Sequence, residues 1–346
     1  MASAEFGRRA LLGGIVALAA CAPLVRGAAS AQSVAAGPSR SSAGPELRQN
    51  TFISYDGAAL PLKVWPARDA AGDLVEPWGV VIGLHGFNDT AAESFCLAGP
   101  AWAKAGLTTY AFDQRGFGGA PHRGRWAGED AMTQDVRTIC DLLRDRHPDA
   151  TLAVAGESMG GAVAASAFGS DRPPSADRAV LLSPAVWGWD RQAPLNAMAL
   201  RVLARLSPGL AISPPRWLVD DEACTDNAEM LRRMDADPAE IDNPRVDAAY
   251  GLMDLMQSAE RRLPRIKADT LYLYGAHDRL IPREAAFAAA ASLGPSGRSA
   301  YYPDGWHLLA RDLHADRVLG DVVGYLRDPA APLPSSPPPV PAVAAA

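Results

Sequence analysis

The chain has 346 residues, of which 48% are hydrophobic and 21% charged, and its formal net charge at pH 7 is −6. These values are close to the averages of soluble globular proteins and exclude a chain that is disordered throughout. The negative net charge argues against a nucleic-acid partner, because phosphate binding requires clustered Lys and Arg, and no such cluster is present.

The first 31 residues have the pattern of an export signal. Arg8 and Arg9 precede an apolar run over residues 10–20, which is too short to span a membrane comfortably. The run ends in Leu-Ala-Ala-Cys at Cys21, which resembles the lipobox of bacterial lipoproteins, in which the cysteine is acylated. We expect an exported protein on the periplasmic side, anchored to the membrane through Cys21. An A-x-A pattern at residues 29–31 leaves a soluble periplasmic or secreted form as the alternative.

Both ends of the chain differ in composition from its middle. Residues 32–48 are rich in Ser, Ala, Gly and Pro and predict a flexible spacer. Residues 329–346 are rich in Pro and Ala and predict a disordered tail. The folded domain is therefore expected over residues 49–328.

Within this domain, short apolar runs alternate with longer helix-like stretches. Continuous runs of this length are typical of parallel strands buried on both faces. The helix-like stretch Glu129–His147 has apolar residues at helical spacing and predicts a crossover helix. The pattern predicts a doubly wound, mostly parallel sheet, which an antiparallel hairpin around Asp56-Gly57 precedes. The predicted parallel strands are Gly79–Leu84, Leu107–Phe112, Thr151–Ala155, Ala179–Leu182, Thr270–Tyr274 and Ser299–Tyr302.

The alternation stops between about residues 187 and 262, where helix-like segments with many large apolar side chains follow one another. This pattern predicts a helical cap inserted into the sheet domain. One segment, residues 196–206, mixes apolar groups with two arginines. It either lines the mouth of a pocket or lies at a lipid surface.

A G-x-S-x-G pentapeptide is the main chemical signal of the chain. It covers residues 156–160, directly after a predicted strand and before a run of small residues typical of a helix. This context predicts a nucleophile elbow, a sharp turn from strand to helix with the serine at its tip. Glycine is expected at both flanks because the strand and helix backbones crowd there. Ser158 is therefore the candidate nucleophile.

A serine hydroxyl needs a base to take its proton and an acid to orient that base. In this type of fold the chain order is Ser, then Asp or Glu, then His. His307 lies in a loop after the last predicted strand and is the candidate base. Asp278 lies in the loop after the strand that ends at Tyr274 and is the candidate orienting carboxylate.

The negative charge that develops on the substrate carbonyl oxygen needs backbone N–H donors. One expected donor is Met159, the residue after the nucleophile. The other is Phe87, in the His-Gly loop that follows the strand Gly79–Leu84. We expect His85 to support this loop rather than to act on the substrate.

Together these motifs resemble the monoacylglycerol lipase and lysophospholipase group of α/β-hydrolases, of the serine aminopeptidase S33 type. The resemblance spans Phe52 to Leu326 and includes a cap in the expected place. It departs from the family at Asp113-Gln114-Arg115, where a histidine is common. The resemblance implies hydrolysis of a single-chain lipid ester without a metal or an organic cofactor.

Other functions fit the same residues. Within enzymes, the triad serves equally a small-ester esterase, a thioesterase or an aminopeptidase, and the cap would decide between them. From a different class, the fold can serve as a non-catalytic binding module, against which the complete set of Ser158, Asp278 and His307 argues.

Overall fold

The computed structural model describes residues 44–211 and 224–342. The predicted export signal over residues 1–31, with Cys21, and the predicted spacer up to residue 43 lie outside the described residues. None of the helices in the described ranges is both long and apolar enough to cross a membrane.

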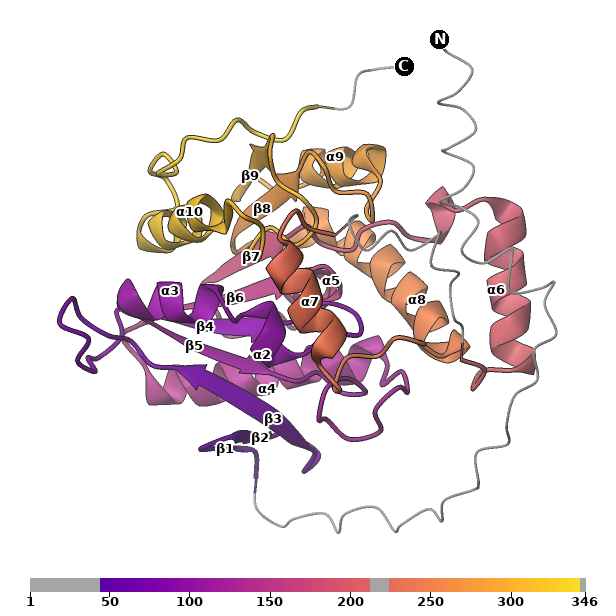
Figure 1. Ribbon diagram of the computed structural model, residues 1–346, viewed down its shortest axis with the longest axis horizontal. Helices are drawn as coiled ribbons and strands as arrows, with labels where there is room; N and C mark the ends of the chain where they lie inside the picture. Colours follow the sequence, from indigo (N-terminus) through magenta and orange to yellow (C-terminus); the bar gives the residue numbers. More distant parts are fainter. Residues whose placement is uncertain (1–43, 212–223, 343–346) are drawn as a thin grey trace.

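A nine-stranded sheet runs through the described part of the chain, in the order β1-β2-β3-β5-β4-β6-β7-β8-β9 (Figure 1). β2 pairs antiparallel with β1 and with β3, β3 pairs antiparallel with β5, and all other neighbours are parallel. The predicted doubly wound, mostly parallel sheet with a leading hairpin is therefore confirmed. The strands are β1 (Glu46–Arg48), β2 (Thr51–Ile53), β3 (Ala59–Trp65), β4 (Gly79–Leu84), β5 (Leu107–Phe112), β6 (Thr151–Glu157), β7 (Arg178–Leu182), β8 (Asp269–Gly275) and β9 (Gly297–Tyr302).

Helices cover both faces of this sheet, which is why β4 and β5 are buried at every position. Successive residues of β4 point to opposite faces, so Val80 and Ile82 join one apolar cluster and Val81 joins the other. The first cluster includes α4 (Glu129–Arg146), α5 (Met159–Phe168) and α9 (Arg283–Ala291). The second includes α3 (Ala98–Lys104), which follows the short α2 (Ala91–Ser94), and α10 (Ala315–Arg327).

The predicted cap corresponds to helices between β7 and β8. Among them, α8 packs against α5, and its Leu255, Met256 and Ala259 belong to the main core. In contrast, α6 lies at the periphery beyond α8 (Figure 1). The elements of this region are η3 (Trp189–Arg191), α6 (Pro194–Leu206), α7 (Ala228–Ala236), α8 (Val246–Arg262) and η5 (Leu263–Arg265).

The structure differs from the sequence prediction at both ends of the domain. Residues 46–48, predicted to be spacer, form β1, in which Leu47 pairs with Phe52 of β2. Residues 329–342, predicted to be disordered, contact both α10 and β9. Pro338 accepts a hydrogen bond from Tyr301 N–H at 2.7 Å, and Val340 N–H donates to Ser299 Oγ at 3.1 Å. β9 is an edge strand, so one side of it lacks a neighbouring strand. The Pro-rich segment provides hydrogen-bond partners on that side, which the composition of the segment does not predict.

Candidate active site

Ser158 lies at the sharp turn between β6 and α5. Its backbone has φ +51° and ψ −112°, a conformation that is costly for any residue with a Cβ. Its neighbours Glu157 and Met159 are buried, whereas Ser158 itself is partly exposed. The turn therefore presents the Ser158 hydroxyl at the carboxyl edge of the parallel strands, as a nucleophile elbow requires.

Two flanking glycines permit this turn because no side chain fits at either position. A Cβ on Gly160 would lie 2.1 Å from the carbonyl oxygen of Leu84 in β4. A Cβ on Gly156 would lie 2.3 Å from the carbonyl oxygen of Gly160. The crowding expected from the G-x-S-x-G sequence thus has a definite source, which is the approach of α5 to β4 and β6.

His307 and Asp278 come from loops after β9 and β8 and meet at the same edge of the sheet. His307 Nδ1 lies 2.8 Å from Asp278 Oδ2, and the two side chains are 2% and 0% exposed. Asp278 Oδ1 accepts the N–H groups of Leu280 and Ile281, both at 2.9 Å. Each carboxylate oxygen therefore has its own partners, and the orientation of the Asp278 side chain is fixed.

The charge of Asp278 and its hydrogen bond shift the pKa of His307. Burial by itself lowers the pKa of His307, but the charge of Asp278, its hydrogen bond and, more weakly, Glu157 raise it. The net effect is a pKa above the usual 6.5. With Nδ1–H donated to Asp278, the neutral imidazole carries its lone pair on Nε2, where it can accept a proton.

Ser158 and His307 are not joined by a hydrogen bond in the described part of the chain. Such contacts are often long in ligand-free enzymes and tighten when substrate binds. The structure therefore brings Asp278 and His307 together directly, and presents Ser158 at the same edge of the sheet from the neighbouring elbow.

The loop after β4 lies against the elbow. A Cβ placed on Gly86 would be 3.7 Å from the Cβ of Ser158. Phe87 follows in this loop, and Met159 is the first residue of α5. Within the described residues, neither backbone N–H donates to another protein group. Both amides thus remain available for an oxygen atom bound next to Ser158.

His85 fixes this loop through hydrogen bonds of its ring. Its ring is fully buried, and its Nε2 accepts the backbone N–H of Gln114 at 2.8 Å. Nδ1 therefore carries the proton and donates it to the carbonyl of Gly86 at 2.7 Å. The Gln114 side chain donates back to the His85 carbonyl at 2.8 Å. Burial lowers the pKa of His85, so the ring is neutral and acts as a support.

Sequence reasoning missed one group of residues next to the nucleophile. Arg311 is buried and contacts both Asp89 and Glu157. These residues are widely separated along the chain, and only Glu157 belongs to a recognisable motif, the pentapeptide.

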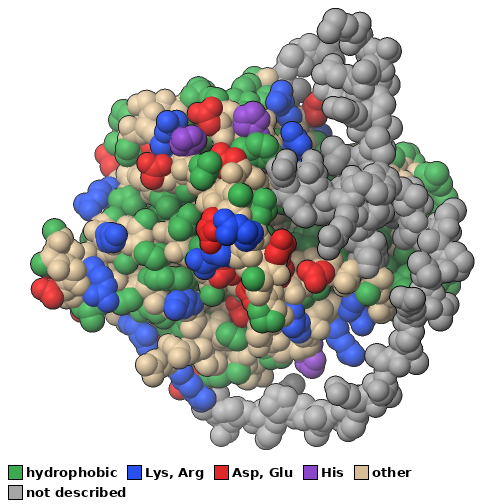
Figure 2. Space-filling view, in the orientation of Figure 1, with side chains coloured by type: hydrophobic (Ala, Val, Ile, Leu, Met, Phe, Trp, Pro, Cys, Tyr) green, Lys and Arg blue, Asp and Glu red, His purple; other side chains and the backbone are tan. Residues whose placement is uncertain are grey.

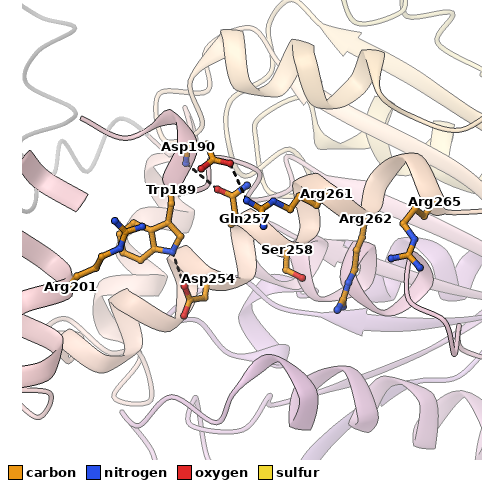
Figure 3. A pocket seen from close by; sticks show the side chains of 9 residues that line it. All are labelled: Trp189, Asp190, Arg201, Asp254, Gln257, Ser258, Arg261, Arg262 and Arg265. Atoms are coloured by element: carbon orange, nitrogen blue, oxygen red, sulfur yellow. Dashed lines mark hydrogen bonds and ion pairs between the residues drawn. The ribbon is translucent and has the colours of Figure 1, made fainter. Parts of the chain in front are cut away.

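A separate cleft of about 500 Å³ lies between η3, α6 and α8 (Figure 3). No triad residue lines it, and most of its charges are paired locally. Arg261 pairs with Asp190 at 3.2 Å, and Arg201 stacks over the Trp189 ring at 4.5 Å from its centroid. Acidic and basic side chains are likewise interspersed over the face of the molecule in Figure 2. The cleft is therefore distinct from the site at Ser158.

Comparison with known proteins identifies the family of the chain. The family model described as serine aminopeptidase, S33, matches residues 75–314. The chain belongs to this family. The matched range of this S33 hydrolase contains Ser158, Asp278 and His307 as well as the loop of Phe87.

Relatives of this S33 hydrolase include lipases. It is 29% identical over 237 residues to a monoacylglycerol lipase of Mycolicibacterium smegmatis, covering 68% of this chain and 80% of the relative. It is 25% identical over 186 residues to the monoglyceride lipase of Mus musculus, covering 53% of this chain and 59% of the relative.

Solved structures show the same fold. The monoacylglycerol lipase of Paleococcus ferrophilus superposes with a TM-score of 0.62 at 21% identity, covering 77% of this chain and 98% of that one. A soluble variant of the Saccharomyces cerevisiae monoglyceride lipase gives 0.66 at 17% identity, with coverages of 84% and 97%. This S33 hydrolase is therefore an enzyme of the α/β-hydrolase fold, and its lipase relatives put ester hydrolysis first among the reactions of that fold.

Proposed function

We propose that this S33 hydrolase cleaves carboxylic esters through Ser158, His307 and Asp278, with monoacylglycerol or lysophospholipid as the substrate. The observation that carries the proposal is the buried Asp278–His307 hydrogen bond of 2.8 Å at the sheet edge where the strained Ser158 turn projects. A strained backbone at Ser158 and a buried, oriented imidazole serve catalysis, and a non-catalytic binding module does not need them.

The mechanism follows from the atoms that face one another. Ser158 Oγ attacks the ester carbonyl while His307 Nε2 takes its proton, and Asp278 stabilises the imidazolium that forms. His307 then protonates the leaving alcohol, which leaves an acyl group on Ser158. Water attacks this acyl-enzyme with His307 again acting as base, and the acid is released.

The oxyanion would lie between two backbone donors. Met159 N–H begins α5, and Phe87 N–H belongs to the loop that packs against Ser158. His85 and Gln114 fix that loop, so the donors need no rearrangement during the reaction.

A lipid substrate is supported by the names of the relatives and by the outer face of α6. This face carries four exposed apolar side chains at helical spacing. They are Leu195 (66% exposed), Met198 (56%), Val202 (49%) and Leu206 (76%). An apolar stripe of this kind would favour the approach of a lipid aggregate over that of a small polar ester.

We also propose that the protein is exported and anchored through an acylated Cys21. This proposal rests on the sequence of the first 31 residues alone. Metabolic labelling with a radioactive fatty acid is expected to mark the wild-type chain and not Cys21→Ala. Labelling of neither, with release of a soluble form, would favour cleavage after the A-x-A pattern instead.

The test of the activity is a substrate panel applied to the protein without residues 1–31 and to its Ser158→Ala variant. The panel contains p-nitrophenyl esters from acetate to palmitate, monoacylglycerol, lysophosphatidylcholine, an acyl thioester and an aminoacyl anilide. We expect the highest kcat/KM on single-chain lipid esters and its loss in the variant. A preference for acetate, the thioester or the anilide would replace the lipid assignment, and no turnover of any substrate would favour a binding module.

A further inference from the structure

A buried arginine contacts the residue that precedes the nucleophile. Arg311 follows His307 in the loop before α10, and its side chain is 1% exposed. One nitrogen, Nη2, donates to Glu157 Oε2 at 2.5 Å and to Asp89 Oδ2 at 2.6 Å. A single guanidinium group thus bridges two buried carboxylates.

The residues that Arg311 joins come from the two segments that carry the oxyanion donors. Glu157 is the last residue of β6, next to Ser158 and Met159. Asp89 belongs to the same loop as Phe87, and it also accepts Ser94 Oγ–H at 2.8 Å. Arg311 itself lies in the loop of His307. All of these parts of the site are therefore connected through one side chain.

The network is not arranged for maximum stability. Among the described residues, Arg311 Nε, Arg311 Nη1 and Glu157 Oε1 are buried without a hydrogen-bond partner. Burying ions costs desolvation energy, and apolar residues of similar size often stabilise a fold equally well or better. A buried ionic bridge at this position is therefore better explained by the geometry that it fixes.

We propose that Arg311 is a positioning residue, which sets the separation of the Met159 and Phe87 N–H donors by tying Glu157 to Asp89. This inference rests on the ester hydrolysis proposed above. Loss of one preorganised oxyanion donor lowers kcat by about 10²–10³. A donor that is misplaced but still present should lower kcat by less than this.

We therefore expect Arg311→Met to lower kcat by up to about 10² and to change KM less than about threefold, because the donors act mainly on the transition state. Arg311→Lys should recover only part of this loss, because it keeps the positive charge between the two carboxylates but its side chain is one atom shorter than that of arginine. The isosteric Glu157→Gln variant should lower kcat by about tenfold.

The pH profile provides a readout that a purely structural role would not change. Burial and the charge of Arg311 lower the pKa of His307, whereas Asp278 and, more weakly, the charge of Glu157 raise it. Removal of the Glu157 charge should lower the pKa of His307. In Glu157→Gln, the acid limb of kcat/KM should therefore move to lower pH than in the wild type.

The experiment uses the full-length chain with a soluble p-nitrophenyl ester, and it measures the rate at which a fluorophosphonate labels Ser158 as well as kcat. Asp135→Asn is the matched control for lost stability. Asp135 is 1% exposed, and it accepts hydrogen bonds from Ser54 and Arg115 rather than from any residue of the site. We expect this control to lower the melting temperature without changing kcat or the labelling rate of the folded protein.

The outcomes separate the two proposals. A wild-type chain that neither hydrolyses the ester nor reacts with the probe overturns the proposed function, and the role of Arg311 with it. An active wild type with unchanged kcat and labelling in folded Arg311→Met overturns the positioning role alone. If Arg311→Met does not fold, Glu157→Gln decides, and an unchanged kcat and acid limb in that variant reject the inference.

Discussion

Replacement of Asp278 by Asn tests the orientation of the imidazole, because the structure predicts which way the new amide will face. Asp278 Oδ1 accepts the N–H groups of Leu280 and Ile281, so only the amide oxygen can occupy this side. The NH₂ group must then point at His307 Nδ1. It donates to Nδ1 and forces the ring proton onto Nε2, the atom that should accept the Ser158 proton.

The expected loss is large because the base is held in the wrong tautomer. An Asp-to-Asn change in a triad of the same arrangement lowers kcat by about 10⁴, which corresponds to roughly 5.4 kcal/mol of transition-state stabilisation. Asp278→Ala should be less harmful to kcat, since it leaves the neutral His307 free to adopt either tautomer. Initial rates at saturating p-nitrophenyl ester, normalised to the folded fraction, measure both variants.

Asp304→Asn is a matched control in the loop of His307. Its side chain is 65% exposed, and we expect kcat to stay within about twofold of the wild type, as for most surface changes. If Asp278→Asn retains more than a tenth of the wild-type kcat, or if Asp278→Ala is the weaker enzyme, the proposed pinning of the carboxylate is incorrect.

Three other predictions concern the elbow, the pH profile and the tail. Ser158→Gly should raise the melting temperature. The positive φ of Ser158 destabilises the fold by about 1–3 kcal/mol, and glycine adopts the same φ without this cost. A lower melting temperature would contradict this reasoning. The acid limb of kcat/KM should have its midpoint above pH 6.5, since activity is lost when the pH falls through the raised pKa of His307; a midpoint below 6.5 would argue against the Asp278 interaction. Deletion of residues 329–346 should lower the melting temperature and promote aggregation, because it uncovers Tyr301 on edge strand β9, and unchanged light scattering on heating would count against this.

The sequence revealed the parts of the fold that local patterns encode. β4 and β5 have the predicted bounds because strands buried on both faces must be continuous apolar runs. The elbow was recognisable because only glycine fits beside Ser158, and Asp278 and His307 could be chosen because the loops after β8 and β9 reach the same sheet edge. Each of these predictions depends on residues that are close together in the sequence, or on the order of the strands in the sheet.

Contacts between distant segments could not be predicted in this way. The tail is Pro-rich, and only its position along β9 shows that Pro338 and Val340 have partners there. Likewise, α6 and α8 both look amphipathic, yet only α8 packs on the core. The bridge from Arg311 to Glu157 and Asp89 joins three separate loops and strands. A charged residue at such a position resembles a surface residue in the sequence, because its burial depends on partners that only the folded chain brings within hydrogen-bonding distance.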